Sequence, residues 1–76
     1  MKIYQEIEIV ASALRRDGLE YNSERLLRAH RGIFNETELF MAWRWHLDKI
    51  LELSSISTNT REEAARLRSL VDEALR

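Results

Sequence analysis

The segment Leu39–Leu53 constrains the fold of this chain most, because its apolar residues do not fit on one face of a helix. At about 100° per residue, one broad stripe holds Leu39, Phe40, Trp43, Leu47, Ile50 and Leu51. Met41 and Trp45 fall among the charged residues of the other side, four positions apart and therefore next to each other. A surface helix needs only one apolar stripe, so the second apolar face predicts that something else packs there.

Helical periodicity runs through the whole sequence with little interruption. The chain has no Pro and only two Gly, and four helices are predicted over about residues 2–16, 23–31, 36–53 and 61–75. The core stripe of the first consists of Ile3, Ile7, Val10 and Leu14. Gly18 can then adopt a left-handed cap, with Leu19 folded back onto the helix. The sequence thus predicts a Schellman ending for the first helix.

Polar residues that can accept hydrogen bonds from free amides predict where the later helices begin. The predicted N-caps are Asn22, Asn35 and Thr60. Glu38 and Glu63 stand three residues after the last two and complete a capping box in each case. Phe34 is expected to pack on Leu39 as a hydrophobic staple, and Gly32 is expected to close a short second helix.

Length and composition indicate one small domain. The chain has 76 residues, of which 45% are hydrophobic and 33% charged, a size at which a single core is only just sufficient. We therefore expect an all-α fold, a compact bundle of four helices with the second short and the third most buried.

The second apolar face of Met41 and Trp45 has more than one interpretation. The C-terminal helix or the loop at residues 54–59 could cover it, it could bind a partner, or it could be exposed without consequence. Trp and Met are enriched in interface cores, and Arg44 stands beside them. Lys49, one turn after Trp45, could lie over the indole ring.

Two further groups of residues are candidates for binding. Ile9 and Ala13 are a second apolar pair on the polar side of their helix, and could extend a partner surface. Five arginines could form a phosphate-binding patch: Arg15, Arg16, Arg25, Arg28 and Arg31. Three of them also suit helix C-termini electrostatically, and nearby Glu20 and Glu24 can neutralise the patch. The acidic start of the third helix argues against insertion into a DNA groove.

The sequence shows no arrangement of residues typical of an enzyme or a metal site. His30 and His46 do not occur in the spacings that project two metal ligands from one helix. His30 is expected to be a hydrogen-bonded, half-buried side chain. The serines lack a neighbouring base, and Gly18 and Gly32 are interpreted as caps and not as a phosphate loop. We expect no catalytic activity, no metal and no cofactor, except for a site assembled across a dimer.

Charge and cysteine content say little about location. The formal net charge is −1 at pH 7 and there is no Cys, so neither a general attraction to polyanions nor a disulfide framework is expected. Glu6 and Glu8 interrupt the N-terminal region where a signal peptide needs apolar residues. A cytoplasmic protein that does not enter membranes is the expectation.

The segment Asn35–Leu47 resembles a loose group of small bacterial helical proteins without an assigned activity. The resemblance rests on Thr37, Glu38, Arg44, Trp45 and Leu47. It implies a bacterial source and brings no activity or catalytic residue with it.

These observations predict a non-enzymatic helical protein that acts by protein–protein interaction. The partner is either a second copy, which would make a homodimer, or another protein, bound through Met41, Trp45 and Arg44 with Ile9 and Ala13 as additional surface. Small immunity proteins that neutralise toxins are of this size and class, an analogy of fold only. The alternatives are an accessory nucleic-acid binder that uses the arginine patch and an assembly module of a larger complex.

Overall fold

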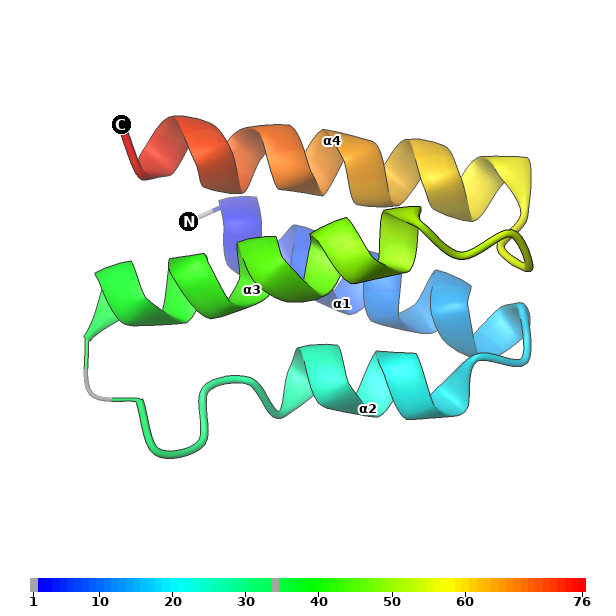
Figure 1. Ribbon diagram of the computed structural model, residues 1–76, viewed down its shortest axis with the longest axis horizontal. Helices are drawn as coiled ribbons and strands as arrows, with labels where there is room; N and C mark the ends of the chain where they lie inside the picture. Colours follow the sequence, from blue (N-terminus) through cyan, green and yellow to red (C-terminus); the bar gives the residue numbers. More distant parts are fainter. Residues whose placement is uncertain (1, 34) are drawn as a thin grey trace.

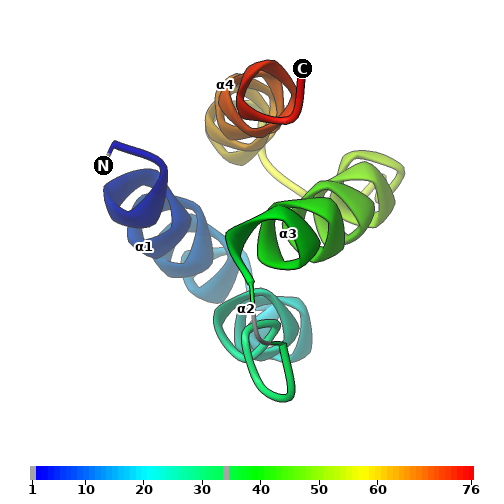
Figure 2. The ribbon, with the colours of Figure 1, turned by 90° about the vertical axis from the view of Figure 1, so that its left-hand side faces the viewer.

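Four antiparallel helices form the molecule, and each packs against its neighbours in the sequence. The computed structural model describes residues 2–33 and 35–76, with helices α1 (Lys2–Arg16), α2 (Glu20–Leu27), α3 (Glu36–Leu51) and α4 (Thr58–Ala74). The chain runs alternately in opposite directions along the bundle (Figure 1). Seen end-on, α1 and α3 lie across the bundle from each other, with α2 and α4 between them (Figure 2). The predicted all-α, four-helix architecture is confirmed.

The core consists of the apolar stripes that helical periodicity identifies. Its completely enclosed apolar side chains include Val10, Leu14, Leu26, Leu47, Leu67 and Val71. Phe40 stacks on Trp43 with ring centroids 5.9 Å apart. The third helix is not the most buried, contrary to the expectation from its composition: α1 contributes seven buried residues and α3 four. The reason is that α1 packs along both α2 and α4, whereas α3 packs mainly on α4.

The end of α1 is the predicted Schellman motif. Gly18 has a φ of 80°, and the amide of Leu19 donates to the carbonyl of Leu14 at 2.9 Å. The amide of Gly18 donates to the carbonyl of Arg15 at 3.1 Å. Leu19 packs against the core, which completes the motif.

The predicted bounds of the second helix were wrong at both ends. Leu19 is the N-cap and makes no side-chain cap bond, so Asn22 lies inside the helix. The helix stops at Leu27, and Gly32, with a φ of 76°, ends a series of turns after it. A side chain binds one carbonyl of its last turn: Trp43 Nε1 donates to Leu26 O at 2.9 Å. This bond joins the last turn of α2 to α3.

The starts of α3 and α4 show one correct and one wrong prediction. Asn35 caps α3, since its Oδ1 accepts from the amide of Glu38 at 2.8 Å. Phe34, the expected staple, lies outside the described residues. Ser57 caps α4 in place of Thr60, and its Oγ accepts from the Thr60 amide at 3.2 Å. Thr60 is instead buried, with its hydroxyl 3.5 Å from the carbonyl of Ala13.

Within residues 2–33 and 35–76, no helix combines the length and the apolar character that crossing a membrane requires.

Candidate partner-binding surface

Trp45 and Met41 are on the surface of the protein. Their exposed fractions are 54% and 51%, so neither α4 nor the loop at residues 54–59 covers them. The interpretation of Trp45 as a core residue is therefore wrong. α3 buries its other side, which carries Phe40, Trp43, Leu47 and Ile50. The division of the helix into two apolar faces, inferred from periodicity, is present in the structure.

Two neighbours hold the exposed indole of Trp45 in place. The ammonium of Lys49 lies over the ring, 5.4 Å from its centroid, as the i, i+4 spacing predicted. The imidazole of His46 meets the same ring edge-on at 5.1 Å. Contacts with a cation and a ring edge suit the electron-rich face of indole. Trp45 is thus an exposed aromatic residue with a cation and a second ring packed against it.

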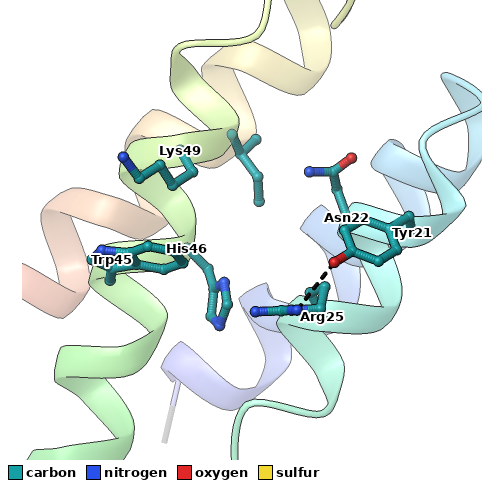
Figure 3. Close-up of a pocket in the computed structure, with 7 residues that line it drawn as sticks. Tyr21, Asn22, Arg25, Trp45, His46 and Lys49 are labelled. Atoms are coloured by element: carbon teal, nitrogen blue, oxygen red, sulfur yellow. Dashed lines mark hydrogen bonds between the residues drawn. The ribbon is translucent and has the colours of Figure 1, made fainter.

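A pocket opens between Trp45 and α2. It has a volume of about 180 Å³ and is shown in Figure 3. The α2 wall consists of Tyr21, Asn22 and Arg25, and the α3 wall of Trp45, His46, Lys49 and Ile50. In Figure 3 the imidazole of His46 projects from α3 toward Arg25 on α2, and the indole of Trp45 lies along α3 on the other side of His46. Two short side-chain rows on neighbouring helices therefore enclose the space.

Arg25 is fixed on the α2 wall by Tyr21. Its Nη1 donates to the Tyr21 hydroxyl at 3.1 Å, and its guanidinium carbon lies 5.7 Å from the centre of the Tyr21 ring. Tyr21 and Arg25 thus repeat on α2 the aromatic–cation pairing, four residues apart, that Trp45 and Lys49 make on α3. This repeated spacing is visible in the sequence, but apolar periodicity and a search for clustered arginines do not reveal it.

The pocket is cationic. Arg25 and Lys49 line it, and none of the described residues in its walls is acidic. The pKa of His46 is lowered, first because its imidazole is partly buried and second because the charge of Arg25 repels a proton. Lys49 has a distant carboxylate partner, with its Nζ 3.9 Å from an oxygen of Glu52. The walls thus combine aromatic surface with positive charge.

Arg44 has a structural contact on the other side of α3. Its Nη1 donates to Oδ1 of Asp72 on α4 at 3.1 Å. Asp72 also accepts from Arg76 at 3.2 Å, and these hydrogen bonds lower the pKa of Asp72. Arg44 therefore joins α3 to α4 and does not line the pocket.

Of the second predicted apolar pair, Ile9 and Ala13, one residue is exposed and the other is buried. Ala13 has an exposed fraction of 1%, so its assignment to a partner surface was wrong. Its backbone carbonyl lies 3.5 Å from the hydroxyl of Thr60, where α4 packs on α1. Ile9 is 45% exposed, but α1 lies across the bundle from α3 (Figure 2). Ile9 and Trp45 do not belong to one surface.

The predicted arginine patch is not a continuous cationic surface. Arg25 faces the pocket, while Arg28 forms an ion pair with Glu24 at 2.9 Å. A hollow beside these residues on α2 also has Glu20 in its wall. Arg15, Arg16 and Arg31 are exposed, the first two in the last turn of α1, where positive charge meets the helix dipole favourably.

The histidines lie apart from any cluster of possible metal ligands. Among the residues that the structure describes, no group of three or more His, Asp or Glu side chains could hold a metal ion. His30 is hydrogen-bonded as expected, with Nδ1 2.9 Å from the carbonyl of Leu27. It is exposed, however, and not half-buried, because α2 has already ended before this residue.

Comparison with known proteins finds no matching family model, no matching curated protein and no matching solved structure.

Proposed function

We propose that this chain acts without catalysis, by binding another protein through the Trp45 surface. We define this surface as Met41 and Trp45 together with the pocket residues Tyr21, Arg25, His46 and Lys49. The observation that carries the proposal is the exposure of a Trp beside a pocket. Trp, Tyr, Met and Arg are the residues enriched in interface cores, and a Trp near a pocket is a typical anchor.

A different protein suits this surface better than a second copy. A twofold axis through Trp45 would place the cationic walls, with Arg25 and Lys49, close to their own copies. Like charges that meet at an interface oppose association. Self-association nevertheless has a direct test. The molar mass measured by light scattering over a tenfold concentration range should stay that of a monomer, and a stable dimer would assign the surface to a second copy.

Capture with matched variants tests the proposal. Wild-type protein, Trp45→Ala and Ile9→Ala serve as baits in a lysate, since Ile9 is an exposed apolar residue away from the surface. A protein retained by wild type and Ile9→Ala but lost from Trp45→Ala is purified and measured by calorimetry. We expect Trp45→Ala to weaken its binding by about tenfold or more, as for an interface anchor.

Circular dichroism supplies the control for folding. Because Trp45 is half exposed, Trp45→Ala should keep the helical content of the wild type. The proposal fails if Trp45→Ala retains every protein that the wild type retains, or if a purified partner binds both with equal affinity.

A further inference from the structure

The charges in the pocket restrict what can occupy it. Arg25 and Lys49 are both in its walls, and no ion pair of Arg25 occurs among residues 2–33 and 35–76. An occupant of the pocket removes water from these cations. Unless it replaces the hydrogen bonds that the water made, the cost of burying the charges opposes binding. A purely apolar side chain cannot do so. An occupant with a negative charge replaces this solvation best.

Arg25 is prepared to bind an anion. Its guanidinium has five N–H donors, and the hydrogen bond to Tyr21 holds one nitrogen of the group. The cation–π contact with the same ring fixes the plane of the group further. The remaining donors can form paired hydrogen bonds with a carboxylate. Because the contact with Tyr21 restrains the side chain, less conformational entropy is lost on binding.

The aromatic walls require an apolar part in the same occupant. Trp45 offers half of its surface to solvent, and Ile50 also lines the pocket. Burying this surface against an apolar group stabilises a complex. A free inorganic anion would leave the aromatic surface in water, so a carboxylate attached to an apolar neighbour fits better.

The charges around the pocket disfavour a polyanion such as nucleic acid. Glu20 and Glu24 lie in the adjoining hollow on α2, and Glu52 approaches Lys49 on α3. A chain of phosphates that crosses the pocket would meet these carboxylates on both sides. A single carboxylate would meet only the cations in its walls.

We infer that the pocket takes a segment of the partner protein in which an Asp or Glu side chain stands next to a large apolar one. The carboxylate pairs with Arg25, with Lys49 beside it, and the apolar side chain lies on Trp45. This inference rests on the proposed function, since it names the chemistry of the partner.

Three capped dipeptides test it on the complete, folded chain: acetyl-Phe-Glu-amide, acetyl-Phe-Gln-amide and acetyl-Phe-Lys-amide. NMR follows the indole N–H of Trp45, assigned with Trp45→Phe, during titration with each. The Glu peptide should shift this signal saturably, with an affinity at least about fivefold above that of the Gln peptide. The Lys peptide should not shift it.

A matched pair of variants assigns the charge preference to one residue. Arg25→Gln should remove the difference between the Glu and Gln peptides. Arg28→Gln should retain it, because Arg28 is on the same helix but pairs with Glu24 outside the pocket. The Glu peptide should also raise the pKa of His46 through its negative charge, whereas the Gln peptide should not.

Several results would overturn the inference. These are equal affinity for the Glu and Gln peptides, equal effects of the two arginine variants, or no shift of Trp45 with any peptide. Tighter binding of an oligothymidylate, falling steeply with salt, would assign the pocket to nucleic acid instead. If the Glu peptide binds but no partner depends on Trp45, the proposed function fails and the chemistry of the pocket stands. If a partner depends on Trp45 but the peptides bind equally, the proposed function stands and the inference about the chemistry of the pocket fails.

Discussion

The indole N–H of Trp43 donates to the backbone carbonyl of Leu26 across the interface between α3 and α2, at 2.9 Å. Both residues are buried. The bond is the shorter of two that the Leu26 carbonyl accepts, the other coming from the Ala29 amide at 3.5 Å. A core side chain of one helix thus binds the last turn of its neighbour.

We expect Trp43→Phe to lower the free energy of unfolding by about 1–3 kcal/mol, because the buried Leu26 carbonyl loses its shorter hydrogen bond and keeps only the one from the Ala29 amide at 3.5 Å. Urea denaturation followed by circular dichroism measures the change. Trp45→Phe is the matched control and should change stability by less than about 0.5 kcal/mol, as expected for an exposed position. A loss as large in Trp45→Phe as in Trp43→Phe would contradict the assignment of one Trp to the core and one to the surface.

The hydrogen bond that Asp17 accepts makes the stability of the fold depend on pH in the acid range. Its Oδ2 accepts from the amide of Ser57 at 2.8 Å, and this hydrogen bond is the main reason why its pKa lies below the ordinary 3.8. A lowered carboxyl pKa stabilises the fold above the unfolded value, and the effect is lost as pH falls through the folded one. Asp17→Asn should therefore destabilise the protein at neutral pH and cost progressively less below pH 3.8.

Denaturation curves at a series of pH values test this. The wild-type and Asp17→Asn curves should converge as the pH falls. A constant separation down to the acid limit would show that the charge of Asp17 plays no part.

His46 predicts a second pH dependence in a different range. Partial burial and the charge of Arg25 lower its pKa from 6.5, so the folded state favours the neutral imidazole. The stabilisation is present above pH 6.5 and is lost as pH falls through the folded pKa. His46→Gln should remove this part of the pH dependence. NMR titration, with the imidazole signals assigned by His30→Gln, should give a His46 midpoint below 6.5, and a midpoint above it would be contrary to the structure.

Glu6 predicts a substitution that stabilises the protein. It is 6% exposed, and its Oε2 has no hydrogen-bond partner among the described residues. Glu6→Leu should raise the free energy of unfolding by about 1 kcal/mol, since it removes an unsatisfied polar atom and adds apolar contact. Glu8→Leu, at an exposed position of the same helix, should have little effect. A lower melting temperature for Glu6→Leu would show that its carboxylate is satisfied in solution.

Local sequence signals predicted the parts of the fold that local interactions decide. The bounds of α1 and the Schellman turn at Gly18 depend on residues within a few positions of one another, and both were predicted correctly. The last turn of α2 is bound by Trp43, distant in the sequence, and the end of this helix was predicted wrongly. At the start of α4, both Ser57 and Thr60 have a hydroxyl that can cap a helix. The choice between them depends on packing, because Thr60 is buried against α1.

In the candidate site, too, local sequence patterns predicted some features, and contacts between helices decided the others. Periodicity alone identified Trp45 and Met41 as apolar residues off the main stripe, which their exposure agrees with. The same reasoning failed for Ala13, because a small residue on the polar side of a helix can be where another helix approaches. The pocket required knowing that Tyr21 and Arg25 face α3, a relationship between two helices that the sequence does not contain.

The two walls of the pocket belong to the pair of adjacent helices that touch each other least. Whatever fills the space between Trp45 and Arg25 also bridges α2 to α3, so a bound segment acts as a clamp on the most weakly attached helix. Binding should then slow hydrogen exchange in α2 more than in α1 or α4. Binding of a partner would therefore be detected by slower hydrogen exchange in this one short helix.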